Sequence, residues 1–293
     1  MQGIATSTQI ISGVREIVDR FDGVVMDLWG CMHDGIRVYP AALDCLERLK
    51  RAGKKIAIVS NAPRRATEVA ARMGELGIAP ELYDALLCSG EETWHYLKDR
   101  PDDAARRLGR RAYVLMAKRD AAFLEGLDLD ITTDVKTAAF LLVCGVEGPG
   151  EQASDFDDVL KRACWDELPL VCANPDLMVH RGEVAEICAG AIARHYEELG
   201  GRVIYHGKPH SGIYRHAMQV LGLGDPARLI GIGDSFRTDV AGAVAFGAQS
   251  LLIAGGIHRE EVMQSGKLDS AYLTKAAAEF PAQPGFAMQY LAW

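Results

Sequence analysis

The sequence predicts an α/β protein whose core is a Rossmann-like, doubly wound parallel sheet. Two observations lead to this prediction: short, continuously apolar runs recur along the chain, and segments with helical periodicity lie between them. Runs this short and this apolar suit strands that are buried on both faces, as in parallel sheets. The alternation of such strands with helices is typical of doubly wound folds. The runs lie at residues 23–26, 55–59, 85–88, 112–116, 139–144, 170–173, 202–205, 229–232 and 250–253.

Start and stop signals mark the helices between these runs. Residues 41–49 follow a proline and end before a glycine, and residues 183–199 are closed by a Gly-Gly pair. We therefore expect a helix in each segment. The apolar, proline-interrupted stretch at residues 281–293 is expected to pack over the core.

The composition is that of an ordinary globular protein. The 293 residues are 49% hydrophobic and 25% charged, which is sufficient for a substantial core. The net charge of -8 provides no basic stripe, so we expect no nucleic-acid partner. The N-terminus lacks the pattern of a signal peptide, and no apolar stretch approaches the ~20 residues of a spanning helix. The seven cysteines form no CxxC pair and are interpreted as reduced core residues. These features predict a cytoplasmic protein with no membrane partner.

Polar side chains follow several of the predicted strands. Asp27, Ser60, Asn61 and Asp234 come directly after apolar runs, and Lys208 lies a few residues beyond another. In an open parallel sheet, ligands bind in the crevice beyond the carboxyl ends of the strands. We therefore expect these residues to contribute to one site.

This set of side chains suits a divalent cation together with a phosphoryl group. A carboxylate can act as nucleophile and form an acyl-phosphate. Mg²⁺ is usually held by one or two carboxylates plus substrate phosphate, a role open to Asp27 and Asp234, with Asp239 supporting them. Lys208 and the Ser60 hydroxyl can neutralise or bind phosphate oxygens.

Each of these residues also has a purely structural interpretation. An aspartate at a strand end often caps a helix, and Ser60 and Asn61 read equally well as caps of a following helix. Lys208, which precedes a proline, reads by default as a surface-loop lysine. Their occurrence in order, each after an apolar run, favours the functional interpretation.

These residues resemble the motifs of the haloacid dehalogenase superfamily. The segment DLWGCMHDG at residues 27–35 is similar to the first motif of that superfamily, and Ser60-Asn61 to the second. HGKPH around Lys208 resembles the third motif, and GDSFRTD at residues 233–239 the fourth, all in family order. Asn174-Pro175-Asp176 and the segment after it are similar to the subgroup that carries a large α/β cap, which includes phosphatases of sugar phosphates, p-nitrophenylphosphate and pyridoxal phosphate.

The resemblance implies a role for each motif residue. Asp27 would be the nucleophile and a ligand of Mg²⁺, the backbone carbonyl of Trp29 a second ligand, and Asp234 a third, with Asp239 behind them. Ser60, Asn61 and Lys208 would bind the phosphoryl group. The substrate would be a small phosphorylated molecule.

The resemblance also implies a domain organisation. Residues 1–88 and 190–293 would form the Rossmann-like core, and residues 89–189 an inserted α/β cap that closes over the site and selects the leaving group. Capped relatives often dimerise through the cap, so a homodimer is one candidate assembly.

The sequence departs from the family pattern at Trp29, where the first motif normally has a second aspartate that acts as general acid and base. An indole cannot exchange a proton at neutral pH, and positioned acid–base catalysis is commonly worth ~10²–10⁴ in rate.

Several interpretations of this departure stay open. His33, in the same loop, has a suitable unperturbed pKa to replace the acid, although it reads equally well as an exposed loop histidine. Alternatively, the substrate has a good leaving group, or the protein binds a phosphorylated ligand with little turnover. A carbon–halogen hydrolase is a further alternative, since that position is also aromatic in metal-free dehalogenases. The cation-site pattern of Asp234 and Asp239 favours hydrolysis at phosphorus.

Overall fold

The structure, a computed structural model, describes residues 8–181 and 184–293 and divides into two compact units. The core unit comprises Ala70–Leu87, Lys208–Trp293 and the described residues up to Ser60. The insert unit comprises Asn61–Val69 and Cys88–Gly207, apart from the two residues that lie outside the described ranges. No helix in the described ranges has the length and apolarity needed to span a membrane.

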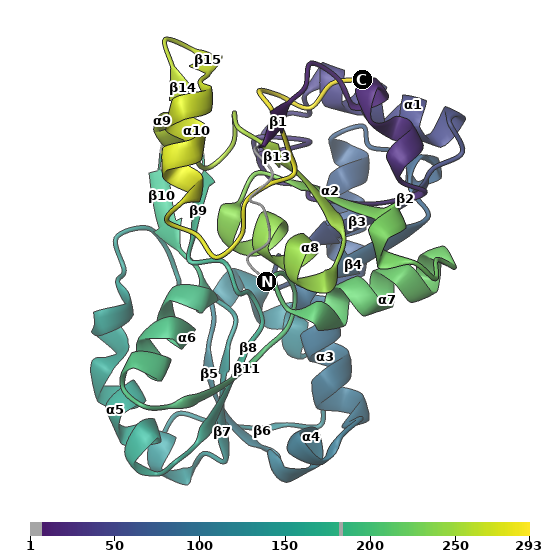
Figure 1. Cartoon of the computed structure of the whole chain (residues 1–293). Helices are drawn as coiled ribbons and strands as arrows, with labels where there is room; N and C mark the ends of the chain where they lie inside the picture. The colour runs from purple at the N-terminus through teal and green to yellow at the C-terminus, as the bar shows by residue number, and fades with distance from the viewer. Residues whose placement is uncertain (1–7, 182–183) are drawn as a thin grey trace, which may run out of the picture. The chain divides into compact units, whose positions relative to one another are not determined.

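The core unit is built on a seven-stranded sheet with the order β1-β16-β13-β12-β2-β3-β4 (Figure 1). The pairings of β2 with β3 and β12, and of β13 with β12 and β16, are parallel, as expected for a doubly wound sheet. The strands are β1 (Gln9–Ile10), β2 (Gly23–Met26), β3 (Lys55–Ser60), β4 (Ala85–Cys88), β12 (Leu229–Gly233), β13 (Gln249–Ile253) and β16 (Phe286–Met288). The helices are α1 (Pro40–Arg51), α7 (Ser211–Leu221), α8 (Ala241–Phe246), α9 (Arg259–Val262), α10 (Ser270–Ala277) and the part of α2 (Ala66–Glu75) that begins at Ala70. A short hairpin pairs β14 (Met263–Gln264) with β15 (Lys267–Leu268).

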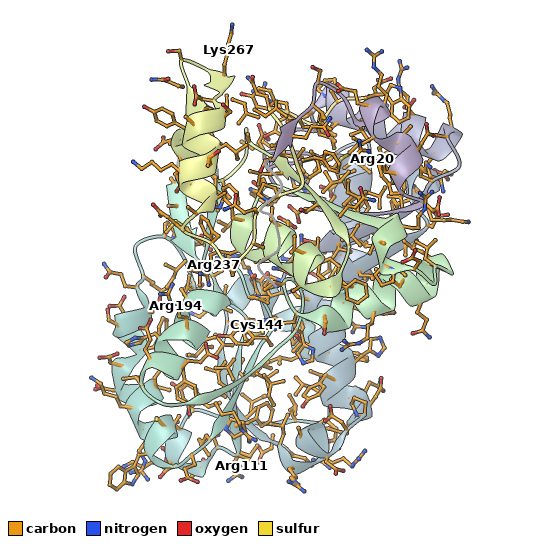
Figure 2. The ribbon with its side chains drawn as sticks, in the orientation of Figure 1. Arg20, Arg111, Cys144, Arg194, Arg237 and Lys267 are labelled. Atoms are coloured by element: carbon orange, nitrogen blue, oxygen red, sulfur yellow. The ribbon has the colours of Figure 1, made fainter. Side chains whose placement is uncertain are left out.

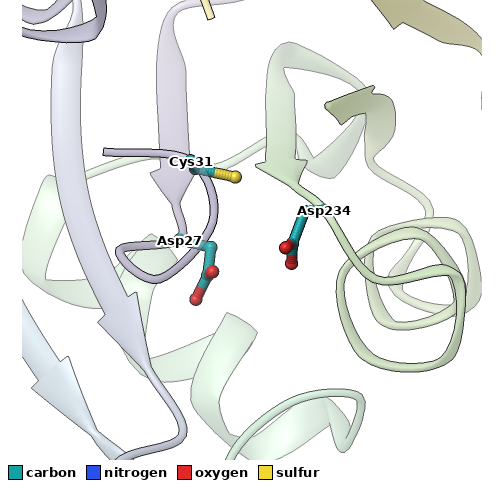
Figure 3. Close-up of side chains that lie close together, drawn as sticks. All are labelled: Asp27, Cys31 and Asp234. Atoms are coloured by element: carbon teal, nitrogen blue, oxygen red, sulfur yellow. The ribbon is translucent and has the colours of Figure 1, made fainter. Parts of the chain in front are cut away.

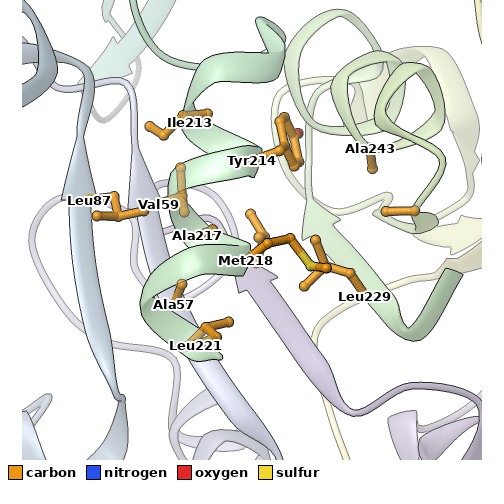
Figure 4. Packing of buried hydrophobic residues seen from close by; sticks show 12 residues of the cluster. Ala57, Val59, Leu87, Ile213, Tyr214, Ala217, Met218, Leu221, Leu229 and Ala243 are labelled. Atoms are coloured by element: carbon orange, nitrogen blue, oxygen red, sulfur yellow. The ribbon is translucent and has the colours of Figure 1, made fainter. Parts of the chain in front are cut away.

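Helix α7 shows how the sequence builds this core. Ile213, Ala217 and Leu221 recur at helical spacing and lie buried against the sheet (Figure 4). They pack with Val59 of β3 and Leu229 of β12 in one cluster. Burial of each large aliphatic side chain contributes roughly 1.5–3 kcal/mol, so this face fixes the helix on the sheet.

The insert unit has its own five-stranded parallel sheet with the order β11-β8-β7-β5-β6. Helices α5 and α6 pack on one face of this sheet, and α3 and α4 pack on the other. Arg111 and Arg194 lie on the outside of this unit, whereas Cys144 is buried within it (Figure 2). The elements are β5 (Arg111–Leu115), β6 (Asp130–Thr132), β7 (Phe140–Val143), β8 (Pro169–Cys172), β11 (Arg202–Tyr205), α3 (Ser89–Asp99), α4 (Asp103–Arg107), α5 (Asp157–Trp165) and α6 (Ala189–Glu198), with an antiparallel hairpin of β9 (Met178–Arg181) and β10 (Val184–Ile187).

The structure differs from the sequence prediction at the segment 183–199. Only Ala189–Glu198 is helical, because Val184–Ile187 pairs with β9 as strand β10. The first residue of the predicted helix lies outside the described residues.

Two further differences concern the C-terminal part of the chain. The second border between the units falls at 207/208 instead of 189/190, because β11 pairs with β8 and so belongs to the insert sheet. Within the stretch 281–293, Phe286–Met288 does not pack over the core sheet but joins it as strand β16.

Candidate active site

The candidate site lies in the core unit, at the carboxyl ends of two neighbouring strands. Asp27 follows β2 and Asp234 follows β12. The two strands pair in parallel with Met26 opposite Ile232, and the Asp27 amide donates a hydrogen bond to the Ile232 carbonyl at 2.9 Å. This register places both carboxylates at the same edge of the sheet, where the sequence predicted them.

Lys208 joins the site through two short ion pairs. Its Nζ donates to Asp27 Oδ1 at 2.5 Å and to Asp239 Oδ1 at 2.7 Å. The lysine is only 2% exposed, so the interpretation as a surface-loop lysine is wrong. Burial alone would lower the pKa of Lys208, but the carboxylates of Asp239 and Asp27 outweigh it and raise the pKa well above its usual value. Lys208 is therefore a permanent positive charge between two carboxylates.

Asp239 is held by the turn that follows β12. The segment Phe236–Val240 forms a π-type turn, and the Ser235 amide donates to Asp239 Oδ2 at 3.1 Å. A Cβ at Gly233 would lie 1.9 Å from Asp239 Cγ. Glycine is thus required at the end of β12 for this carboxylate to reach Lys208.

Asp234 is held by backbone from two loops. The Ile257 amide donates to Asp234 Oδ2 at 2.8 Å. A Cβ at Gly30, whose φ is +76°, would lie 1.9 Å from Asp234 Oδ2, and a Cβ at Gly256 would lie 2.1 Å from the same oxygen. Sequence reasoning missed the contribution of the loop after β13, although the glycine pair directly after an apolar run was a usable signal.

The charges of the site suit a bound cation. Asp27, Asp234 and Asp239 are all buried, and Lys208 forms ion pairs with Asp27 and Asp239. Burial, together with the charges of Asp27 and Asp239, raises the pKa of Asp234 well above its usual value. A divalent cation would offset this excess of negative charge, so the residues present fit a metal ion.

Cys31 also contributes to this cluster. One ligand atom from each of Asp27, Cys31 and Asp234 lies within 4.8 Å of the others (Figure 3). Burial raises the pKa of the Cys31 thiol well above its usual value, and the nearby carboxylates raise it further. Sequence reasoning interpreted the cysteines as core residues, and the position of Cys31 in the first-motif loop was the only signal of this proximity.

Trp29 and His33 pack together in the first-motif loop. Their rings meet edge to face with centroids 5.3 Å apart, and a Cβ at Gly35 would lie 2.5 Å from the Trp29 ring. The Gly35 amide donates to His33 Nδ1 at 2.9 Å. His33 is 5% exposed, so its interpretation as an exposed loop histidine is wrong.

The environment of His33 bears directly on acid catalysis. Burial lowers the pKa of His33 to about 4, and the positive charge of Arg72 acts in the same direction. At neutral pH the imidazole is therefore uncharged, and it lacks the extra proton that a general acid would transfer.

The two second-motif residues lie on either side of a unit border. Ser60 ends β3 in the core unit, and Asn61 begins the insert unit. Neither caps a helix, because α2 begins only at Ala66. The Asn61 amide group donates to Asp176 Oδ1 at 2.8 Å, which links Asn61 to the Asn-Pro-Asp turn within the insert unit.

Comparison with known proteins agrees with this fold. A family model described as haloacid dehalogenase-like hydrolase matches residues 24–130, and one described as HAD-hydrolase-like matches residues 205–280. Chronophin of Homo sapiens is 28% identical, with 87% of this chain and 88% of chronophin covered. Ribonucleotide monophosphatase NagD of Escherichia coli (strain K12) is 24% identical over 91% of this chain and 98% of its own.

Solved structures extend the comparison. A hydrolase of the haloacid dehalogenase-like family from Brucella suis 1330 is 33% identical, with a TM-score of 0.79 over 96% of this chain and 99% of that one. A p-nitrophenyl phosphatase from Archaeoglobus fulgidus is 23% identical and shares the fold, with a TM-score of 0.67 over 92% and 96% of the two chains. The chain therefore belongs to the haloacid dehalogenase-like family of hydrolases.

Proposed function

We propose that this hydrolase is a Mg²⁺-dependent phosphatase of small phosphorylated metabolites and works through an aspartyl-phosphate on Asp27. The observation that carries the proposal is the buried group in which Lys208 bridges Asp27 and Asp239 beside Asp234. A structural ion pair needs one carboxylate for one lysine. A third buried carboxylate lowers the stability of the folded state unless a cation binds beside it.

The chain's own residues have distinct roles in this proposal. Asp27 attacks phosphorus and displaces the leaving group, and water then hydrolyses the acyl-phosphate to return the carboxylate and release phosphate. The Lys208 ammonium fixes the Asp27 carboxylate through Oδ1 and adds positive charge beside the incoming phosphate. Asp239 keeps Lys208 in position from the other side.

Mg²⁺ would be held by Asp27, the backbone carbonyl of Trp29 and Asp234. When bound, the ion neutralises phosphate charge so that a carboxylate can approach it. Ser60, Asn61 and Lys208 would bind the phosphoryl group. The insert unit would serve as the cap that selects the leaving group.

A second candidate is a protein that binds phosphorylated ligands and turns them over slowly. The observations that favour it are Trp29 in place of the usual acid and the low pKa of the buried His33. With neither residue able to donate a proton at neutral pH, alkyl phosphates would react slowly. Aryl or other esters with good leaving groups would keep most of their reactivity.

Phosphate release from a panel of esters tests both candidates. The names of the relatives direct the choice of nucleoside monophosphates and p-nitrophenyl phosphate, to which sugar phosphates are added. We expect release that requires Mg²⁺, stops in EDTA and is lost in Asp27→Asn, with the exposed Asp22→Asn as matched control. Release from aryl esters alone would support the interpretation that the site has no general acid. No release from any ester would refute the phosphatase proposal and leave the binding protein and the carbon–halogen hydrolase.

A further inference from the structure

The buried thiol of Cys31 lies beside the carboxylates that are proposed to hold Mg²⁺. Its side chain extends from the first-motif loop towards the space between Asp27 and Asp234 (Figure 3). One ligand atom from each of the three residues lies within 4.8 Å of the other two. Cys31 is 1% exposed, and within residues 8–181 and 184–293 its thiol makes no hydrogen bond.

We propose that Asp27, Cys31 and Asp234 together form a site for a thiophilic divalent cation, such as Zn²⁺ or Cd²⁺, that competes with Mg²⁺. Mg²⁺ prefers oxygen ligands and has no use for the sulfur. A thiophilic cation takes the sulfur as well: the Cys31 S–H bond breaks, a metal–sulfur bond forms, and the proton leaves to solvent.

The spacing of the three ligand atoms suits coordination of such an ion. Zn²⁺ binds sulfur at about 2.3 Å and carboxylate oxygen at about 2.0–2.2 Å, so tetrahedral ligand atoms lie about 3.5 Å apart. The observed limit of 4.8 Å requires the atoms to approach by at most about 1.3 Å. Three protein ligands with an open fourth position are typical of zinc in enzymes.

The protein environment supports the same ligand set. The Ile257 amide and the close approach of Gly30 and Gly256 hold Asp234 in place. Lys208 holds Asp27 through Oδ1. Two ligands are thus oriented in advance, and the thiol lies next to both.

This arrangement gives the site two states with different consequences. Mg²⁺ engages the oxygens alone and leaves the sulfur unused. A thiophilic cation uses the same two carboxylates, so the two ions exclude each other. We expect trace Zn²⁺ to occupy the site in the presence of a large excess of Mg²⁺ and to block whatever reaction Mg²⁺ supports.

The test is a titration of the full-length, metal-free chain with CdCl₂, under reducing conditions and without substrate. A sulfur-to-cadmium charge-transfer band in the ultraviolet reports thiolate binding directly. We expect the band to saturate at one equivalent and to disappear in Cys31→Ser. The matched control is Cys45→Ala, which alters another buried thiol of the core unit and should keep the band.

Affinities for ZnCl₂ and MgCl₂ supply the second measurement. Cys31→Ser should weaken Zn²⁺ binding at least ten-fold and change Mg²⁺ binding less than three-fold. A band that persists in Cys31→Ser, or an equal loss of affinity for both ions, would overturn the proposal.

If Cys31→Ser fails to fold, cadmium-113 NMR of the unaltered chain decides instead. A chemical shift typical of one sulfur with oxygen ligands supports the site, and an all-oxygen shift refutes it. Binding is measured without turnover, so failure of the phosphatase proposal would not affect this result.

Discussion

Replacement of Lys208 by methionine removes the positive charge from a group of three buried carboxylates while keeping a side chain of similar length. Removal of one partner of a buried ion pair typically costs about 3–5 kcal/mol, because the remaining charge is left without compensation. Here Asp27 and Asp239 both lose the lysine, at 2.5 and 2.7 Å. We therefore expect a loss of about 3–5 kcal/mol in the free energy of unfolding, measured by urea titration in EDTA.

Two controls separate charge from packing. Lys55→Met alters an exposed lysine whose Nζ lies 3.8 Å from Asp84 Oδ1, and it should lower the free energy of unfolding by less than about 1 kcal/mol. The double variant Lys208→Met/Asp239→Asn should recover at least about 1 kcal/mol relative to Lys208→Met, since one of the unpaired charges is gone. A Lys208→Met loss no larger than that of Lys55→Met, or no recovery in the double variant, would contradict the electrostatic account of the site.

Two further predictions concern the loops around the site. The folded state keeps His33 neutral with a pKa of about 4, whereas the unfolded chain takes up a proton near pH 6.5, so stability is full above pH ~6.5 and falls as the pH decreases towards ~4. We expect the free energy of unfolding to fall by about 2 kcal/mol between pH ~7 and pH ~5, and this fall to be absent in His33→Asn. An equal fall in the variant would exclude His33 as its source. Gly30→Ala combines a positive φ with a Cβ only 1.9 Å from Asp234 Oδ2, whereas Gly53→Ala has a similar φ and no neighbour within 4 Å. Gly53→Ala should therefore lower the free energy of unfolding by about 1 kcal/mol, and Gly30→Ala should lower it by about 2–4 kcal/mol. Gly30→Ala should also weaken Mg²⁺ binding, measured by Mg²⁺ titration. Equal effects of the two substitutions would refute the steric argument.

The apolar runs predicted the main strands of both sheets because buried parallel strands need apolar residues on both faces. The runs at 23–26, 85–88 and 202–205, for example, coincide with β2, β4 and β11. The sheet to which a run belongs is not encoded in its own residues. The run at 202–205 pairs with β8 in the insert unit, and this pairing moved the second border.

The hairpin of β9 and β10 was missed for a related reason. The apolar residues from Val184 to Tyr196 continue a spacing that suits a helix, and only the pairing of Val184–Ile187 with β9 makes the first part a strand. Such pairing is a tertiary effect that overrides local pattern.

At the site, the sequence predicted the group of Asp27, Lys208, Asp234 and Asp239. The first three follow apolar runs, and Asp239 belongs to the segment that resembles the fourth motif. It did not predict the burial of His33 or the proximity of Cys31 to the carboxylates. Both depend on how the first-motif loop folds back on itself, with Trp29 packed against Gly35 and His33. Loop conformation of this kind leaves no periodic signal.

The backbone clamp on Asp234 has a consequence for how this chain can vary. The group that donates to the carboxylate is the amide of Ile257, so any residue except proline keeps the donor at that position. Gly30 and Gly256 are the opposite case, because any side chain there occupies the volume of the carboxylate itself. In random mutagenesis, we therefore expect substitutions of Gly30 and Gly256 to be rejected, although neither residue has a functional side chain. Substitutions of Ile257, whose amide makes the hydrogen bond, should be widely tolerated. At this site, natural sequences would therefore vary less at the two glycines that leave room for Asp234 than at the residue that donates the hydrogen bond to it.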